Sequence, residues 1–384
     1  MKILIISNML SLWSGGHTRN IFQLAKALRK LGHNIEFFVH RISDPEIDDT
    51  GFVIHKSGLP KYNILSFSRA AEQFVRYNSN QFDVIHCNGG SSYSVMGIPL
   101  GKRPPAVLHL RAANYRNSLA IFHDDLLRYY PRYLKQGIGA YFEWYFDKIS
   151  ISGADHVFCN SRETLEAVAL KVGMRNKMSV LHNGMESLNI PYNEDSTTDL
   201  TVGYFARFFL QKGWLYFFAI AKEILRINPK MKILIAGKGE LEWFVKKQIR
   251  SLSIENNFTF VGGIDSEAKK QEFFRNISLF LCPTAPGTTS LEALSYGVPV
   301  LVAKRSKDVT DGLDLEFFVN TGDVRQLIDA TPLQVATENF QFHEELQNRG
   351  NVSNDVNEIE REYLWGAIAR KCAAKYEYII NVKN

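Results

Sequence analysis

The sequence predicts an α/β protein with two doubly wound parallel-sheet domains, one after the other along the chain. Apolar runs of strand length alternate with longer stretches of helical periodicity, the pattern of a parallel sheet covered by helices on both faces. The pattern stops at a polar segment and then restarts, and the run "MKILI" occurs at residues 1–5 and again at 231–235. We therefore expect two Rossmann-like domains.

The first half of the chain supplies its strands as short apolar runs. The run at 2–7 is followed by a helical pattern at 18–33, in which Ile21, Leu24 and Leu28 share one face and Gly32 is the stop signal. The expected strands are "KILIIS" (2–7), "IEFFVH" (35–40), "VIHC" (84–87), "AVLHL" (106–110) and "HVFCNS" (156–161).

The second half repeats this organisation after a polar stretch, "NIPYNEDSTTD" (189–199), which we interpret as a linker. The expected strands are "LTVGYFA" (200–206), "MKILIAG" (231–237), "FTFVGG" (258–263), "SLFLCPT" (278–284) and "VPVLVA" (298–303). The second domain is therefore expected at 200–362.

Composition narrows the class of protein. The 384 residues are 45% hydrophobic and 22% charged, and the formal net charge is +5. Lysine and arginine are spread along the chain, so no nucleic-acid partner is expected, while the mild basic excess suits an anionic small ligand or an anionic membrane surface. The four separated cysteines indicate reduced, half-buried thiols of a cytoplasmic protein, and we expect neither a signal peptide nor a membrane span.

Glycine-rich turns mark the predicted ligand sites, because parallel sheets bind ligands beyond the carboxyl ends of their strands. One turn contains Gly15 and Gly16, and another is "AGKGE" after Ile235. In the third, "TAPGTTS", a helix beginning near Thr288 would offer an anion its free N–H groups. Glu292 lies one turn further on, where a carboxylate can hold the vicinal diol of a ribose, although a solvated helix acid is the simpler alternative.

Two cations stand at the end of the first strand of the second half. Arg207 ends an apolar run, and Lys212 precedes Gly213 and a new helix. A guanidinium and an ammonium at one strand end suit a diphosphate, although each alone is equally well interpreted as a solvated loop charge.

These motifs together resemble the family-4 retaining glycosyltransferases of the GT-B fold, over nearly the whole chain. The matching pieces include "FDVIHCNGG", "ADHVFCNSRETLEAV", "SVLHNGME", "ARFFLQKG", "ILIAGKGE" and "LEALSYGVPVLVA". The resemblance implies transfer of a sugar from a nucleoside-diphosphate donor to an acceptor hydroxyl with retention, with no metal and no cofactor. It also implies that the donor is held mainly by the second domain and the acceptor by the first.

The resemblance assigns roles to individual residues. Arg207 and Lys212 match the catalytic pair that neutralises the departing diphosphate, and Glu292 matches the acid that holds the ribose. Gly287, Thr288 and Thr289 are assigned to the donor phosphates, and Gly16 approaches the diphosphate from the first domain. Gly15 is assigned to the acceptor or sugar side, as is Asn183 at the hinge motif, where an ordinary Asn-Gly turn is the alternative.

The departures from the family pattern are as informative. Thr284 stands where the signature's first acid would touch the donor sugar, and Arg111 stands where the family has a histidine. Arg111 could bind a phosphate, an acceptor carboxylate or a neighbouring aspartate, and His109, two residues earlier, is more typical of a strand histidine than of a catalyst. The sugar end of the site is therefore expected to differ from the family's usual one, while the nucleotide end is kept.

Two further segments carry predictions. The stretch 126–148 is dense in aromatic residues with interleaved cations, which fits either an interface with an anionic membrane carrying a lipid-linked acceptor or a helix packed into the core. The amphipathic segment 360–382 is expected to return to the first domain as in relatives, giving a domain of 1–188 plus 363–384.

Other functions remain to be weighed. A nicotinamide dehydrogenase is disfavoured, because Glu242 stands where the third glycine of its fingerprint should be. A sugar-nucleotide 2-epimerase shares the architecture, and a catalytically degenerate binder of a glycan or partner enzyme is compatible with Thr284 and Arg111. The expected setting is bacterial envelope or exported-polysaccharide synthesis, in the cytoplasm or peripherally on the inner face of the membrane.

Overall fold

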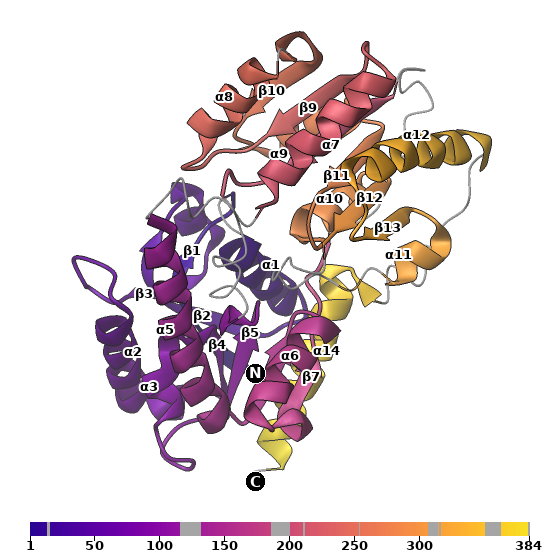
Figure 1. Cartoon of the computed structure of the whole chain (residues 1–384). Coiled ribbons are helices and arrows are strands. Elements are labelled where there is room, and N and C mark those ends of the chain that lie inside the picture. The colour runs from indigo at the N-terminus through magenta and orange to yellow at the C-terminus, as the bar shows by residue number, and fades with distance from the viewer. Residues whose placement is uncertain are drawn as a thin grey trace. The chain divides into compact units, whose positions relative to one another are not determined.

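The computed structural model describes residues 1–13, 16–115, 132–185, 200–209, 212–252, 254–305, 314, 316–349 and 362–382, and only the backbone at 17, 132–137, 316, 317 and 349. The chain divides into two compact units, each of which is described by itself. Unit 1 comprises Met1–Gly184 and Glu360–Asn384, and unit 2 comprises Met185–Ile359 (Figure 1). The sequence-based boundaries were 1–188 with 363–384 and 200–362, and the expected linker at 189–199 lies outside the described residues.

Unit 1 has a parallel sheet whose described strands run in the order β3-β2-β1-β4-β5-β6-β7. The strands are β1 (Lys2–Leu10), β2 (Asn34–Ile42), β3 (Val53–Lys56), β4 (Val84–Asn88), β5 (Ala106–Leu110), β6 (His156–Cys159) and β7 (Met178–Val180). The helices are α1 (Gly16–Lys30), α2 (Ile64–Asn78), α3 (Tyr93–Met96), α5 (Arg132–Gly153), α6 (Arg162–Val172) and α14 (Trp365–Asn381), with short 3₁₀ turns η1 (Pro45–Thr50), η2 (Ser79–Gln81), η3 (Gly90–Ser92) and η5 (Arg175–Lys177).

The alternation of side chains along β1 separates two hydrophobic cores. Ile3 and Ile5 point to the face covered by α1 and α14, where Ile368 and Tyr376 are buried with them. Leu4 and Ile6 point to the opposite face, whose core includes residues of α2, α3, α5 and α6. The C-terminal helix α14, yellow in Figure 1, thus belongs to the sheet built by the first part of the chain and packs on α1.

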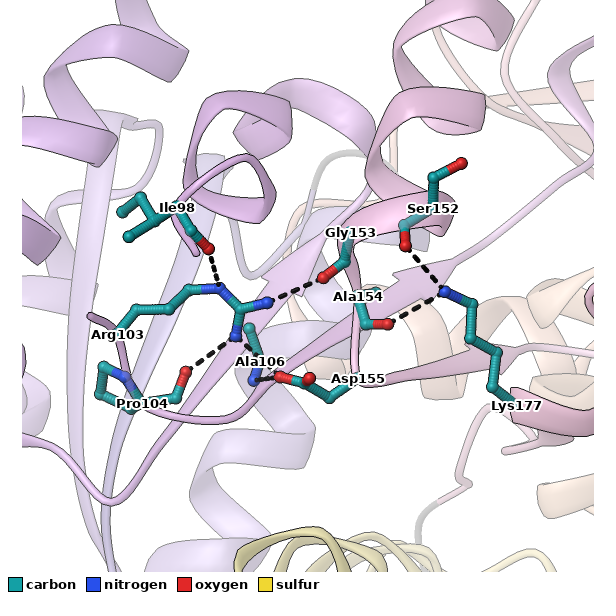
Figure 2. A network of polar contacts seen from close by, with 9 residues as sticks. All are labelled: Ile98, Arg103, Pro104, Ala106, Ser152, Gly153, Ala154, Asp155 and Lys177. Atoms are coloured by element: carbon teal, nitrogen blue, oxygen red, sulfur yellow. Dashed lines mark hydrogen bonds and ion pairs between the residues drawn. The ribbon is translucent and has the colours of Figure 1, made fainter. Parts of the chain in front are cut away.

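A buried arginine fastens the loop before β5 to the end of α5 (Figure 2). The guanidinium of Arg103 donates to Asp155 Oδ2 at 2.7 Å and also to the backbone carbonyls of Ile98, Pro104 and Gly153. The ammonium of Lys177 donates to two more carbonyls at the same helix end. Positive charges satisfy the free carbonyl groups there and oppose the negative end of the helix dipole.

Unit 2 has a second parallel sheet, with described strands in the order β10-β9-β8-β11-β12-β13. The strands are β8 (Thr201–Phe205), β9 (Lys232–Ala236), β10 (Phe258–Gly262), β11 (Leu279–Cys282), β12 (Val300–Lys304) and β13 (Val324–Ile328). The helices are α7 (Trp214–Ile227), α8 (Glu242–Ser251), α9 (Glu267–Arg275), α10 (Thr288–Ser295), α11 (Glu316–Thr321) and α12 (Pro332–Arg349), with a 3₁₀ turn η7 (Glu255–Asn257).

Both sheets are doubly wound, which confirms the predicted fold class. The strand order reverses between β1 and β4 in unit 1 and between β8 and β11 in unit 2. Loops leave such neighbouring strands toward opposite faces, and ligands bind in the crevice that this reversal opens at the carboxyl ends. The functional side chains are therefore to be sought after β8 and β11, and after β1, β4 and β5.

The cysteines differ from the expectation in their degree of burial. All four are free thiols, but they are fully buried rather than half-buried. None of the helices in the described ranges combines the length and the apolar character that a bilayer span needs.

Candidate functional site

The loops that follow β8, β9 and β11 lie against one another in unit 2, and glycines make this approach possible. A Cβ on Gly213 would come within 2.6 Å of Thr284 and 2.9 Å of the Pro283 carbonyl oxygen. A Cβ on Gly237 or Gly239 would likewise collide with the backbone that follows β8. The structure therefore brings Arg207, Lys212 and the start of α10 together at the switch point of this sheet.

Arg207 and Lys212 present positive charge at this point. The Arg207 guanidinium is exposed and lies 4.9 Å from the centre of the Phe209 ring, while Lys212 is half-buried. Among the residues that the structure describes, neither side chain forms an ion pair. Desolvation, followed by the positive charge of Arg207, lowers the pKa of the Lys212 ammonium. The negative charge of an anion bound beside the two cations would act in the opposite direction and raise the pKa of Lys212.

Helix α10 adds hydrogen-bond donors to the cations. It begins at Thr288 directly after Gly287, and this N-cap glycine has no side chain with which to cap the helix. Thr288 and Thr289 are half-buried at this end of the helix. The first N–H groups of a helix and its positive dipole end together favour an anion such as a phosphate.

Thr284 does not present its side chain to this site. The residue is only 5% exposed, and its hydroxyl donates to the Ala285 carbonyl at 3.2 Å. The threonine that replaces the family's first acid is thus folded into the β11–α10 loop, against Gly213.

Glu292 has a cationic neighbour that the sequence analysis missed. Lys270 on α9 is only 3% exposed, and its Nζ lies 3.7 Å from Glu292 Oε1 and 2.8 Å from Glu267 Oε2. The hydroxyl of Tyr296 also donates to Glu267. The Lys270 ammonium thus places a positive charge beside the Glu292 carboxyl group, whose oxygens can accept hydrogen bonds. The available signal was a lysine at an apolar position of the α9 pattern, beside Phe273 and Phe274.

In unit 1, the structure brings Arg111 and Asn183 together at the carboxyl end of β5, whereas His109 lies within that strand. Arg111 Nη1 donates to Asn183 Oδ1 at 2.8 Å, and Arg111 Nε donates to Asn88 Oδ1 at 3.3 Å. Asn88, which ends β4, was not predicted as a site residue, because its role depends on which strand neighbours β5.

His109 is a buried histidine of the sheet, as the sequence suggested. It is 1% exposed, and its Nδ1 lies 3.2 Å from His86 Nε2, while Tyr376 of α14 bonds to the other ring nitrogen of His86. Burial, followed by the charge of Arg111, lowers the pKa of His86 to about 3, so this ring is neutral at physiological pH.

Gly16 is the first residue of α1 in unit 1, two residues before the helix that was expected from Thr18, while Gly15 lies outside the described residues. The aromatic stretch 126–148 is described with side chains only from 138 onward. There the α5 helix exposes a stripe, which we call the α5 stripe, made of Ile138, Tyr141, Phe142, Tyr145 and Ile149, all at least 37% exposed. The alternative that this stretch buries its aromatic residues in the core is wrong for these side chains.

No group of three or more histidine, cysteine, aspartate or glutamate side chains is placed to hold a metal ion in the described ranges. The site geometry of unit 2 therefore consists of the two cations, the opening of α10, and Glu292 with Lys270.

Two family models match consecutive parts of the chain. The family described as Glycosyltransferase Family 4 matches residues 14–187, and the family described as Glycosyl transferases group 1 matches residues 188–312. The first model covers most of unit 1 and the second covers the strands β8 to β12 of unit 2.

Individual relatives are distant. The chain is 23% identical over 308 residues to the phosphatidylinositol N-acetylglucosaminyltransferase gpi3 subunit of Schizosaccharomyces pombe, and the match covers 76% of this chain but only 63% of that protein. It is 22% identical over 316 residues to the alpha-monoglucosyldiacylglycerol synthase of Streptococcus pneumoniae, covering 74% of this chain and 67% of that protein.

A solved structure of similar fold is Anabaena Alr3699/HepE in complex with UDP and glucose. It has a TM-score of 0.72 at 17% identity, and the match covers 98% of this chain and 99% of that one. At this identity the likeness bears on the fold alone, which is the two-domain GT-B arrangement of parallel-sheet domains.

Proposed function

Because the chain belongs to the GT-B glycosyltransferases that the family-4 and group-1 models describe, we propose that it moves a sugar from a nucleoside-diphosphate donor to an acceptor hydroxyl. The donor diphosphate binds in unit 2, the reaction retains the anomeric configuration, and it requires no metal ion.

One observation supports this proposal most strongly. Arg207 and Lys212 stand together at the switch point of unit 2, without an ion pair among the described residues, beside the start of α10, whose N-cap residue is Gly287. Two unpaired cations and a helix N-terminus are the donor set that a diphosphate needs. Because they can offset the charge of the leaving group themselves, a metal ion has no necessary role in that task.

In the proposed reaction, the acceptor hydroxyl attacks the anomeric carbon from the face on which the diphosphate departs. The bond between the anomeric carbon and the phosphate oxygen breaks as the new glycosidic bond forms. The acceptor's proton passes to the departing phosphate oxygen, so no protein nucleophile is required. Arg207 and Lys212 stabilise the negative charge that develops on that oxygen.

Glu292 is proposed to hold the ribose hydroxyls of the donor nucleotide. Lys270 places a positive charge beside this carboxylate from the α9 side. Each ribose hydroxyl can then donate to one carboxylate oxygen.

The acceptor is proposed to be a glycan or a lipid-linked sugar of a bacterial envelope or exported polysaccharide. The relative from Streptococcus pneumoniae is named for a diacylglycerol product, and the one from Schizosaccharomyces pombe for phosphatidylinositol. The α5 stripe supports a peripheral position on the inner face of the cell membrane, because aromatic side chains favour the headgroup region of a bilayer.

The proposal is tested by titrating nucleoside diphosphates into the purified protein and by measuring hydrolysis of the matching nucleotide sugar. We expect Arg207→Ala, Lys212→Ala and Glu292→Ala each to lower turnover by about a hundredfold or more, which is what one group that stabilises a transition state typically contributes. Arg226→Ala is the matched control, because Arg226 lies on α7 of the same unit but pairs on the surface with Glu223.

The outcomes separate the competing functions. Unchanged turnover in all three variants would reject the assigned site. Tight binding of the nucleotide sugar with neither hydrolysis nor transfer would favour a glycan-binding protein without catalysis, and interconversion of the free nucleotide sugar would favour a 2-epimerase. The anomeric configuration of the product, read by NMR, tests retention.

A further inference from the structure

Arg111 is a buried cation with no anionic neighbour among the described residues. Its residue surface is 8% exposed, and its hydrogen-bond partners there are the neutral amide oxygens of Asn88 and Asn183. Its Nη2 is buried and has no hydrogen-bond partner in the described part of the chain. Burying a guanidinium without a counter-charge costs free energy. We therefore expect a buried, unpaired arginine at a position where its positive charge serves a function, such as binding an anion.

The other groups close to Arg111 do not supply that charge. Burial raises the pKa of the Cys372 thiol to about 12 and that of the Tyr376 hydroxyl well above its ordinary value, so both are neutral at pH 7. The nearby His86 is neutral as well, since its pKa is lowered to about 3. Desolvation lowers the pKa of Arg111 itself to about 9, which leaves it positively charged at pH 7.

Arg103 shows how the same unit treats an arginine whose role is structural. Its side chain is 2% exposed, but all three of its nitrogens donate, and Asp155 supplies the opposite charge at 2.7 Å (Figure 2). Arg111 has neither the carboxylate nor the complete set of acceptors among the residues described. The difference between Arg103 and Arg111 indicates that the hydrogen-bond acceptor of the Arg111 guanidinium is not one of the described residues.

Position and geometry point to a ligand as this acceptor. Arg111 directly follows β5, and Asn88 ends the neighbouring strand β4, so both lie at the carboxyl ends of the strands, where parallel sheets bind ligands. The two asparagines hold Nε and Nη1, and Asn88 is in turn held by Ser7 at 3.3 Å. One hydrogen on Nη1 and two on Nη2 remain, which is the fork that binds an oxyanion through two parallel hydrogen bonds.

We infer that Arg111 binds an oxyanion, a carboxylate or a phosphate group, of a substrate seated on unit 1. Asn88 and Asn183 act as positioning residues that orient the guanidinium. This inference rests on the proposed function only in assigning the oxyanion to a substrate. If Arg111 binds this oxyanion, the negatively charged group of the substrate helps to determine which substrate is accepted. A histidine at position 111 would instead offer a contact to a neutral sugar.

The test measures anion binding to the full-length chain in a background that lacks the cations of unit 2. In the Arg207→Ala/Lys212→Ala protein, stability is followed by thermal shift while inorganic phosphate, sodium glucuronate or neutral glucose is titrated. We expect one of the two anions to stabilise the protein and glucose to have no effect. Adding Arg111→Gln should weaken the binding of that anion by about tenfold or more. Adding Arg111→Lys should weaken its binding less, because lysine keeps the positive charge but lacks the forked geometry of the guanidinium.

Arg76→Gln in the same background is the control, since Arg76 is a surface arginine of unit 1 paired with Glu72. The stronger of the two anions identifies the ligand as a carboxylate or a phosphate. Anion binding that is unchanged by Arg111→Gln, or no binding of either anion, would overturn the inference. If the protein carrying Arg111→Gln does not fold, wild-type crystals soaked in each anion decide the question, because density beside the Arg111 guanidinium is required.

These outcomes are independent of the proposed function. A nucleoside diphosphate that binds the wild-type protein through Arg207 and Lys212 supports the transferase proposal whether or not Arg111 binds an anion. Conversely, anion binding that depends on Arg111 would stand even if no donor were hydrolysed.

Discussion

Asp147 is a carboxyl group whose surroundings favour its neutral form. It lies on α5, is 2% exposed, accepts from Asn114 Nδ2 at 2.8 Å, and contacts the backbone of Gly90 in the loop after β4. Desolvation is the main cause that raises its pKa, to about 7. Because the folded state holds this proton more tightly than the unfolded chain does, the carboxyl's contribution to stability is fully present below about pH 4 and is lost as the pH rises through about 7.

We therefore predict that Asp147→Asn makes the protein less sensitive to a rise in pH, because the neutral amide of asparagine cannot ionise in this buried position. At pH 8 the variant should exceed the wild type by on the order of 2 kcal/mol in the free energy of unfolding, and at pH 4 the advantage should be gone. Urea denaturation across this pH range checks the prediction. Asp49→Asn, at an exposed carboxyl of the same unit, serves as the control. An advantage of equal size at both pH values would contradict the assignment.

At this scale the sequence was informative where a residue belongs to a local motif. Arg207, Lys212 and Glu292 each follow a strand at a recognisable spacing, and the strands that they follow, β8 and β11, are neighbours at the switch point of unit 2. Lys270 and Asn88 were missed, because their neighbours come from other strands and helices. Contacts of this kind depend on the order of strands in the sheet, which one sequence does not state.

Among the secondary-structure elements, the loops after β8 and β11 depend on a single glycine. Gly213 has φ +65°, and an added Cβ would meet Thr284 at 2.6 Å and the Pro283 carbonyl oxygen at 2.9 Å. Gly262 in the same unit has φ +81° but open space around an added Cβ. A comparison of alanine substitutions at Gly213 and Gly262 therefore separates the cost of a strained backbone conformation, which both share, from the cost of a steric clash, which is expected only at Gly213.

We predict that Gly262→Ala costs about 1–2 kcal/mol, the usual penalty for a side chain in the left-handed region. Gly213→Ala should cost more and should also weaken nucleoside-diphosphate binding, because Lys212 precedes it and the loop carrying Thr284 would have to move. Denaturant unfolding and a binding titration on both variants give the comparison. Equal losses of stability, with binding unaffected in each, would show that the loop contact is dispensable.

The proposed binding to an anionic membrane surface can be tested by substituting residues of the α5 stripe. Replacing Tyr141, Phe142 and Tyr145 by serine should reduce flotation with liposomes containing anionic lipid by about tenfold, since the buried apolar area and the aromatic anchors are lost together. The triple change should leave unfolding nearly unaffected, because all three side chains are more than half exposed.

The control replaces Tyr77 and Leu170, which are 88% and 83% exposed on other helices of unit 1, by serine. Comparable loss of flotation in the control would mean that general surface hydrophobicity, rather than the α5 stripe, governs the association.

Strands inside the two sheets were predicted well, but edge strands were predicted unevenly: β10 was expected at 258–263, whereas β3, β7 and β13 were missed. Continuous apolar runs such as 106–110 and 279–282 became β5 and β11. The edge strands β3 and β13 were missed, because "VIHK" and "VRQLI" alternate with polar residues or are exposed. An edge strand has one neighbour and a wetter surface, so its sequence carries a weaker signal.

For the whole molecule, the division into two units predicts a local response to the donor. A nucleoside diphosphate at one hundred times its dissociation constant should raise the free energy of unfolding of unit 2 by about 2.7 kcal/mol. Hydrogen exchange followed by mass spectrometry should show added protection around 207–213 and 284–292, while the interior of the unit 1 sheet is unchanged. Added protection confined to unit 1 would mean that the donor binds to unit 1 and would contradict the proposed site in unit 2.

The return of α14 to unit 1 has a consequence for biosynthesis. The ribosome makes the sheet of unit 1 first, but Ile368, Cys372 and Tyr376 complete the core on one of its faces. That face therefore stays uncovered until α14 is translated, and α14 follows all of unit 2 in the chain. Unit 2 can finish folding while the earlier-made sheet is still half covered, so a nascent chain stalled before residue 365 would expose apolar surface to chaperones.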